Sequence, residues 1–157
     1  MKKYLIVFAL IAACLIGCKS TGGSIKDFSD AMGKDLKLLT VHVDSAPFSR
    51  IVLYDRDDLK KEKIENTYTL NFSANTISGV GAPSRYSAPY TRNADQTIKI
   101  EQIRATTLAP IVQPEKLQES VFFAYMQNAY EWKVEGGKLV LLTKGEDESP
   151  VRLVFGL

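Results

Sequence analysis

The segment YEWKVEGGKLVLLT, residues 130–143, consists of two short β-type runs joined by a turn. Before the turn, Trp132 and Val134 alternate with charged residues, which is the period of a strand that buries one face. The turn is Glu135-Gly136-Gly137, and residues 139–143 return as a second apolar strand. The segment therefore predicts a β-hairpin.

Runs of the same kind recur along the chain at a spacing typical of a β-sandwich or barrel. The candidate strands are residues 36–43, 49–54, 68–72, 76–79, 98–103, 130–134, 139–143 and 151–155. We therefore expect a mainly β fold, a compact β-barrel-like antiparallel domain of about eight short strands. Residues 79–90 contain several glycines and prolines, and we expect an ordered loop there rather than a strand.

Residues 115–129 break this pattern, because they lack glycine and proline and follow Pro114, a residue favoured at the first helical position. An apolar stripe at helical spacing runs through the segment. Leu117, Val121, Ala124, Tyr125 and Asn128 fall on the helical spacing, and Phe122 and Met126 widen the apolar stripe. We expect one amphipathic helix.

The N-terminus has the form of a lipoprotein signal. Lys2 and Lys3 precede an apolar run, residues 4–17, and Leu15-Ile16-Gly17-Cys18 closes it. The run is shorter than the about 20 apolar residues that span a bilayer. We therefore expect cleavage before Cys18 and attachment of a lipid to its sulfur.

A second register would place the lipid on Cys14, but it leaves a shorter apolar region, so we favour Cys18. The chain then divides into a signal peptide (1–17), a lipidated flexible tether (18–33) and a globular domain (34–157). Cleavage at this point removes one cysteine and lipidation blocks the other. The mature domain is then left without a thiol for a disulfide, a metal or a nucleophile.

Charge argues against nucleic acid as a partner. The precursor carries a formal charge of +2, and the signal peptide takes Lys2 and Lys3 with it, so the mature chain is formally neutral. A neutral domain offers no bulk attraction for a phosphate backbone.

The sequence also points away from catalysis. His42 is the only histidine and lies between two valines in a strand pattern, as a structural imidazole would. Nucleophile, zinc and phosphate-loop motifs are missing, although a serine with a lysine base stays open. Asp55, Asp57 and Asp58 are interleaved with basic residues and lack the glycine of a calcium loop, so we interpret them as a solvated surface. We therefore expect neither an enzyme, nor a metal, nor a cofactor.

An ordered set of segments between residues 35 and 155 resembles the META domain, a family of heat-inducible bacterial lipoproteins and related secreted proteins. The resemblance rests on residues 36–38, 68–72, 77–79, 79–91 and 103–109, and on Glu119, Phe122, Phe123, Met126, Tyr130, Trp132, Gly136, Leu139 and Leu141. It implies a compact barrel-like fold with a helix packed at one side, and a role in envelope stress tolerance.

The best of these segments carries our candidate binding loop, whose residues are Gly79, Gly81, Arg85, Tyr86 and Tyr90. Loops that a rigid sheet positions are frequent recognition sites. Family members often carry cysteines nearby, where this chain has Ala82, Pro83, Ser84 and Pro110. No redox or disulfide role therefore follows from the resemblance.

Two functions stay open. The first, which we favour, is a lipid-anchored interaction module whose loop meets an envelope protein or polymer. The second is a carrier of an acyl ligand, or a secretion-pilot-like protein, because small barrels sometimes hold one apolar ligand. In a diderm host, Lys19 is not the acidic residue that retains lipoproteins at the inner membrane. We therefore expect an outer-membrane anchor with the domain facing the periplasm.

Overall fold

The computed structural model describes residues 23–45, 49–62, 64–106 and 114–157. Within these ranges the strands are β1 (Leu36–Ser45), β2 (Ser49–Asp55), β3 (Thr69–Phe72), β4 (Thr76–Val80), β5 (Arg85–Arg92), β6 (Ile98–Ile100), β7 (Arg104–Ala105), β8 (Glu131–Glu135), β9 (Lys138–Lys144) and β10 (Pro150–Gly156). The helices are α1 (Phe28–Ala31), α2 (Arg56–Glu62) and α3 (Glu119–Gln127). None of these helices has the length and apolar character needed to cross a bilayer.

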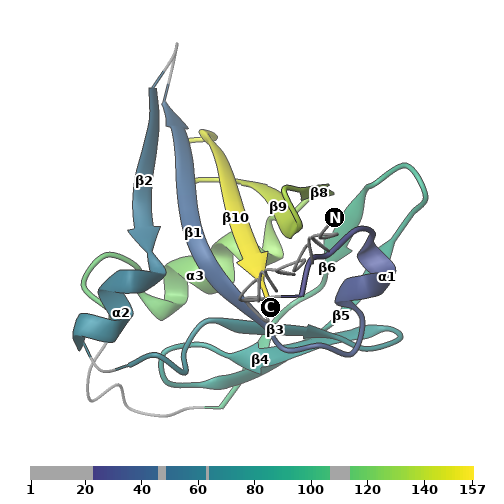
Figure 1. Cartoon of the computed structure of the whole chain (residues 1–157), viewed down its shortest axis with the longest axis horizontal. Coiled ribbons are helices and arrows are strands. Elements are labelled where there is room, and N and C mark those ends of the chain that lie inside the picture. Colours follow the sequence, from purple (N-terminus) through teal and green to yellow (C-terminus); the bar gives the residue numbers. More distant parts are fainter. Residues whose placement is uncertain (1–22, 46–48, 63, 107–113) are drawn as a thin grey trace, which may run out of the picture.

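The strands form one antiparallel sheet in the order β6-β5-β4-β3-β1-β10-β9-β8, and β2 and β7 pair with β1 and β5 beside this path. Strand β1 joins the two halves of the sheet. One edge of β1 pairs with β10, and the other pairs with β3 at Leu36 and Lys37 and with β2 from Thr40 onwards. Figure 1 shows β3, β4 and β5 lying across the base of the upright strands β1, β2 and β10.

The sheet curves strongly but does not close into a barrel. Its two end strands, β6 and β8, share no ladder in the described residues, although they meet at one isolated bridge between Thr97 and Glu131. Two backbone hydrogen bonds accompany this bridge, from the Trp132 N–H to the Gln96 carbonyl (2.9 Å) and from the Ile98 N–H to the Tyr130 carbonyl (3.1 Å). The expectation of a mainly β antiparallel fold is confirmed, while "barrel-like" describes its curvature only loosely.

The predicted hairpin at residues 130–143 is confirmed as β8 and β9, whose register pairs Trp132 with Leu141 and Glu135 with Lys138. Gly136 and Gly137 form its turn with φ angles of 56° and 76°, which glycine adopts without steric cost. Each of the eight predicted strands has a counterpart. The run predicted at 98–103 is shorter, since β6 ends at Ile100.

The predicted helix begins later than expected. Residues 115–118 are not helical, and α3 starts at Glu119 after an extended Gln118. Leu117 is buried, and its carbonyl accepts a hydrogen bond from the hydroxyl of Tyr68 on the sheet. This tertiary contact holds the segment before α3 in a non-helical path, so Pro114 is not the first helical residue.

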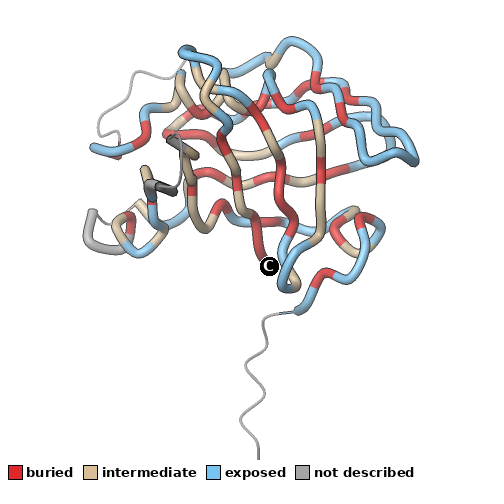
Figure 2. Tube along the Cα trace, turned by 90° about the horizontal axis from the view of Figure 1, so that it is seen from above, coloured by how far each residue is buried: buried red, intermediate tan, exposed pale blue. Residues whose placement is uncertain are grey.

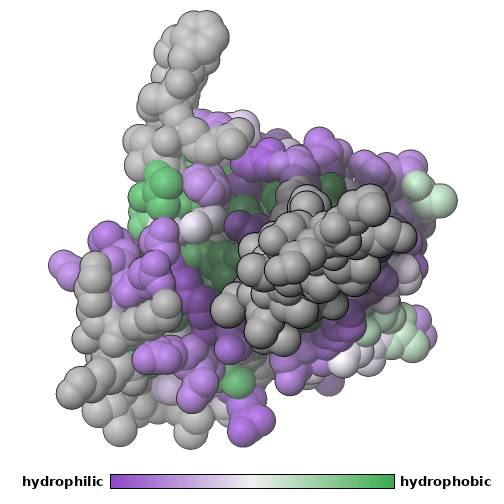
Figure 3. Space-filling view, viewed as in Figure 1, coloured by the Kyte–Doolittle hydropathy of each residue, from purple (hydrophilic) through white to green (hydrophobic). Residues whose placement is uncertain are grey.

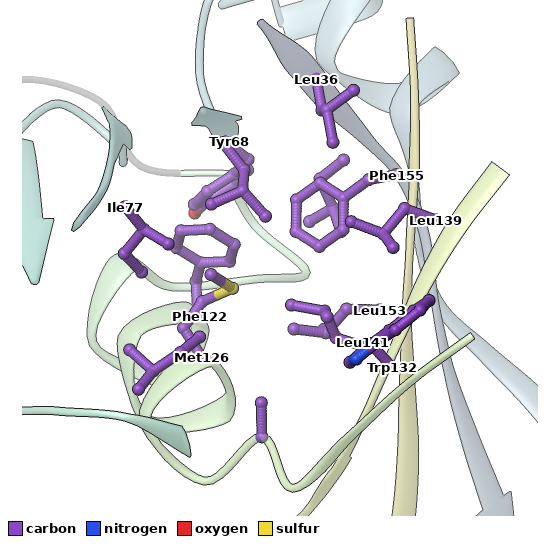
Figure 4. Packing of buried hydrophobic residues seen from close by; sticks show 14 of the residues in the cluster. Leu36, Tyr68, Ile77, Phe122, Met126, Trp132, Leu139, Leu141, Leu153 and Phe155 are labelled. Carbon is purple, nitrogen blue, oxygen red and sulfur yellow. The ribbon is translucent and has the colours of Figure 1, made fainter. Parts of the chain in front are cut away.

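The core lies between α3 and the concave face of the sheet. Phe122 and Met126 of α3 are fully buried and point toward Leu141 and Leu153, while Tyr68 lies against the Phe122 ring at 4.8 Å between centroids (Figure 4). The buried positions gather along the strands in the middle of the molecule, and the exposed ones lie mostly at turns (Figure 2). The helix therefore fills the space that a closed barrel would fill with strand side chains alone.

The tether predicted for residues 18–33 is wrong in its second half, because Ile25, Phe28 and Ala31 are buried in the core. Helix α1 places the Phe28 ring 4.8 Å from both Phe72 and Trp132, measured between ring centroids. Strands are recognised in a sequence by alternation, and helices by a long periodic run of apolar residues. A four-residue helix contains neither pattern. The packed domain therefore begins before residue 34.

We predict that Phe28→Ala lowers the free energy of unfolding by about 3–5 kcal/mol, the usual cost of emptying a buried aromatic site. Chemical denaturation of the full-length chain measures it. Lys26→Ala, an exposed change in the same segment, is the matched control and should leave stability within about 0.5 kcal/mol. Equal midpoints for the two variants would mean that this segment does not contribute to the core.

Candidate functional site

The predicted binding loop at 79–90 is mostly strand. Residues up to Val80 belong to β4, and Arg85–Arg92 is β5, where Tyr86, Ala88 and Tyr90 are buried and the residues between them are exposed. This alternation marks a strand, but the prolines and glycines of the segment concealed it. The loop prediction was therefore wrong, and only the short turn 81–84 connects the two strands.

Tyr86 and Tyr90 face the core rather than a partner. The Tyr86 hydroxyl donates to the Thr69 carbonyl at 2.7 Å, and its ring contacts Phe122 and Phe123. The Tyr90 hydroxyl donates to the Ser73 carbonyl at 3.0 Å. Burial raises the pKa of Tyr86 above its ordinary value. Both side chains fasten β5 to neighbouring backbone, so neither is available to an external ligand.

Gly79 and Gly81 are required by packing. A Cβ on Gly79 would lie 2.0 Å from the Thr69 carbonyl oxygen, and a Cβ on Gly81 would lie 2.5 Å from Oε1 of Glu119. At Gly79 a side chain would press on the backbone of β3, and at Gly81 it would press on the Glu119 carboxylate of α3. These glycines therefore serve the close approach of backbone to its neighbours.

The 81–84 turn is clamped by α3. Oε1 of Glu119 accepts hydrogen bonds from the Ala82 N–H (2.5 Å) and the Ser84 N–H (2.7 Å), and Oε2 accepts one from the Ser84 hydroxyl (2.9 Å). The peptide bond between Ala82 and Pro83 is cis. A carboxylate that receives three donors orients both partners, so Glu119 sets the rotation of α3 about its own axis relative to β4 and β5.

Of the five candidate loop residues, Arg85 alone is exposed. Its backbone pairs with Thr106 beside β7, and another exposed arginine, Arg104, lies opposite Ser87. Because Arg85 and Ser87 share the outer face of β5, the two arginines are diagonal neighbours on one surface. Arg85 is therefore still placed to contact a partner at the surface, whereas the two buried tyrosines are not.

The remaining candidates take structural positions. His42 lies on β1 with Nε2 2.9 Å from the Thr40 hydroxyl. The Asp55 carboxylate accepts the Asp57 N–H at 2.9 Å as α2 begins, and Asp58 pairs with Lys116 at 2.9 Å. Among the described residues no three His, Cys, Asp or Glu side chains gather as a metal site. The signal peptide, Cys14, Cys18, Lys19 and Pro110 lie outside the described residues.

Sequence reading missed a surface groove of about 540 Å³ between α3 and the hairpin of β1 and β2. Val43 of β1 and Leu53 of β2 form one wall, and Val121, Ala124 and Tyr125 of α3 form the other. Three of these side chains belong to the apolar stripe predicted for the helix, and the structure divides that stripe between two faces. Phe122 and Met126 face inward, while Val121, Ala124 and Tyr125 face the groove and are only partly buried.

A β-bulge shapes the strand wall. Val41 pairs with Tyr54 and His42 with Val52, so Leu53 is an extra residue of β2 with no partner on β1. A bulge redirects side chains locally. Here Leu53 lines the groove, while Val52 stays 52% exposed. Apolar atoms gather over β2 on an otherwise mostly polar face (Figure 3).

The loop between β9 and β10 forms an acidic rim, to which Glu146 and Asp147 contribute carboxylates. Asp147 is held in place, because its Oδ1 accepts the Ser149 hydroxyl at 2.6 Å and the Ser149 N–H at 3.1 Å. Among the described residues that line the groove, Lys144 is the cation, and it pairs with Glu148 at 2.6 Å. Burial raises the pKa of Tyr125, and the negative charges of Asp147 and Glu146 raise it further.

The sequence profile of the META domain matches residues 54–154, which is more than half of the chain. The chain belongs to the META domain family. The match includes α3 and the acidic rim, whereas β1 and the groove residue Leu53 precede it. No curated protein sequence matches the chain.

Two solved structures share the fold of this META protein. One is a DUF4847 family protein from Bacteroides vulgatus, with a TM-score of 0.55, 13% sequence identity, and coverage of 82% of this chain and 94% of that one. The other is a protein from Burkholderia xenovorans, with a TM-score of 0.50, 10% identity, and coverage of 99% and 98%. At these identities the similarity concerns fold alone.

We predict that Gly79→Ala destabilises the META domain by about 1–3 kcal/mol, because its methyl group overlaps the Thr69 carbonyl. Arg85→Ala, an exposed change close by, should stay within about 0.5 kcal/mol. Thermal unfolding of the two variants side by side tests both statements. A neutral Gly79→Ala would show that β3 and β4 can separate without cost.

We also predict that replacing Glu146 with Gln and Asp147 with Asn together lowers the pKa of Tyr125. The two carboxylates disfavour the tyrosinate, so removing their charge favours ionisation at lower pH. A pH titration of the Tyr125 ring carbon by NMR measures the shift. Glu115→Gln, at an exposed site outside the groove, is the control and should leave the titration unchanged. An unchanged titration in the double variant would mean that the rim does not act on the groove.

Proposed function

We propose that this META protein is a lipid-anchored envelope lipoprotein whose domain is a non-catalytic binding module, and that the groove beside α3 is its recognition surface. The observation that carries the proposal is the apolar wall of α3, which the described residues leave partly exposed across the groove from a second apolar wall on the β1–β2 hairpin. Concave apolar sites with a few polar groups at the edge are the usual form of binding sites.

The rigid placement of the groove supports this function. Glu119 fastens the first turn of α3 to the 81–84 turn, and Phe122 and Met126 fix the opposite face of the helix in the core. Val121, Ala124 and Tyr125 therefore have little freedom to move inward. A surface of this kind keeps its shape without ligand, which lowers the entropic cost of binding.

The acyl-carrier alternative receives less support from the described residues. Rings in mutual contact occupy the centre of the sheet, including Tyr68, Tyr86 and Phe122. An acyl chain would then have to enter the groove, where Glu146 and Asp147 would repel a carboxylate or phosphate head group. We therefore favour a protein partner. We propose that the groove binds this partner and catalyses no reaction.

Site-specific photocrosslinking in the native host tests the binding function. A photoreactive residue in place of Ser120, at the groove, should give a discrete crosslinked product, and Ala124→Arg should abolish it by filling the groove. Gln118→Arg adds the same charge six residues earlier, at an exposed residue outside the groove, and should leave the product unchanged. Absence of any product, or a product insensitive to Ala124→Arg, would contradict a binding role for the groove.

The anchor is proposed on the N-terminal sequence. We predict that Cys18→Ser abolishes incorporation of labelled palmitate into the full chain, whereas Cys14→Ser does not, because the lipid is expected on the first residue after cleavage. Label retained by Cys18→Ser and lost by Cys14→Ser would establish the alternative register.

Lys19 provides the test of location in a diderm host. The unchanged protein should fractionate with the outer membrane, and Lys19→Asp should move it to the inner membrane, because an acidic residue after the lipidated cysteine favours retention there. Fractionation of the unchanged protein with the inner membrane would contradict the proposed location.

A role in envelope stress tolerance predicts that a deletion strain is sensitive to heat. The unchanged gene should restore heat tolerance to this strain, and the Ala124→Arg variant should not.

A further inference from the structure

A second surface site lies between β5 and β7, where two arginines border one hollow. The hollow has a volume of about 340 Å³, and its lining consists of Arg85, Tyr86, Ser87, Arg104, Ala105 and Thr106. Tyr86 turns its ring toward Phe122 in the core, so its neighbours Arg85 and Ser87 point to the outer face of the sheet. The hollow therefore lies on the side of β5 that faces away from α3.

The pairing of β5 with β7 sets the order of the polar side chains. Ser87 lies opposite Arg104 in this ladder, and Arg85 lies beside Thr106. The Arg85 N–H donates to Oγ1 of Thr106 at 3.1 Å, and the Thr106 N–H donates to the Arg85 carbonyl at 2.9 Å. The two arginines are therefore diagonal neighbours, which in antiparallel pairs lie about 7–8 Å apart. From this spacing both long side chains can reach one group held between them.

The charge of these two arginines is not compensated within the part of the chain that the structure describes. The other arginines with described side chains all have partners, because Arg152 pairs with a carboxylate, Arg56 donates to backbone carbonyls and Arg92 lies over an aromatic ring. In the same described residues, the guanidinium groups of Arg85 and Arg104 have no such partner, and no carboxylate lines the hollow. Two like charges at one hollow repel each other, and a bound anion would remove this repulsion.

The donor groups of the hollow fit a phosphate better than a carboxylate. One guanidinium can occupy both oxygens of a carboxylate by itself. Here two guanidiniums are accompanied by the hydroxyls of Ser87 and Thr106, so donors approach from several directions. A phosphate monoester has three terminal oxygens and a charge of about −1.5 to −2 at pH 7, which the two arginines would balance. The planar fork of arginine also matches phosphate oxygens in pairs.

We propose that the hollow between β5 and β7 binds a phosphate monoester group. The guanidiniums of Arg85 and Arg104 hold the phosphate from two sides, and the hydroxyls of Ser87 and Thr106 donate to its remaining oxygens. A soluble phosphate ester and a lipid head group that ends in phosphate both carry this chemistry. The hollow shares no residue with the groove beside α3, so the site is additional to the binding function proposed above.

The probe is glycerol 3-phosphate, titrated into the full-length chain in detergent solution while amide and arginine Nε–H shifts are followed by NMR. We expect saturable shifts at β5 and β7, and weaker binding as the pH falls below about 6, where the phosphate gains a proton. Acetate should bind at least about tenfold more weakly, because a carboxylate uses fewer of the donors. Equal affinity for acetate, or shifts confined to other strands, would overturn the proposal.

Variants locate the phosphate. Arg85→Gln and Arg104→Gln should each weaken binding at least about tenfold, since each removes charge-assisted hydrogen bonds. Lys138→Gln removes one positive charge at an exposed site outside the hollow and should leave the affinity unchanged. An equal loss in Lys138→Gln would mean that bulk charge attracts the phosphate, and an unchanged affinity in both arginine variants would mean that it binds elsewhere. Either result would overturn the proposal.

A second ligand distinguishes the two sources of the phosphate. Dihexanoyl phosphatidic acid carries the same group on two short acyl chains and stays soluble. Affinity at least about tenfold above that of glycerol 3-phosphate would assign the site to a lipid head group, because the acyl chains then contribute to binding. Equal affinity would assign it to a soluble ester. The groove variant Ala124→Arg should leave both affinities unchanged, so this site and the groove can fail independently.

Discussion

The burial of Phe122 and Met126 from α3 inside an open sheet is the constraint on which the rest of this structure depends. Because β6 and β8 meet at a single bridge, the strands alone do not enclose a core. The helix supplies the missing apolar surface, and Tyr68, Tyr86 and Phe28 close the remaining sides with ring contacts. Removing the inward face of α3 would expose the concave face of the sheet to water, at about 25 cal/mol for each Å² of apolar area.

The same constraint creates the groove. Three hydrogen bonds to Glu119 set the rotation of α3, and the buried face then determines which side chains remain outside. Val121, Ala124 and Tyr125 are apolar residues that stay partly exposed outside the core. Together they form the groove wall that faces the β1–β2 hairpin. Fold stability and the proposed recognition surface therefore use opposite faces of one short helix.

Much of the fold was predictable because β-strands with one buried face alternate with period two, and each of the eight expected strands was found. The failures have physical reasons. Prolines and glycines hid the alternation of Tyr86, Ala88 and Tyr90 in β5, and Pro89 is tolerated there although it lacks a donor. Helix α1 is too short to show a period, and its burial follows from contacts with Phe72 and Trp132, which are distant in sequence.

The sequence by itself determined the antiparallel β class, the hairpin of β8 and β9, the helix, and membership of the META family, because these depend on local period, turn residues and ordered motifs. It also carried the lipoprotein signal as a prediction. Only the tertiary structure decided which face of α3 is buried, that Tyr86 and Tyr90 point inward, and that Glu146 and Asp147 border an apolar groove. These properties arise from contacts between residues far apart in the chain, and local periodicity carries no information about such contacts.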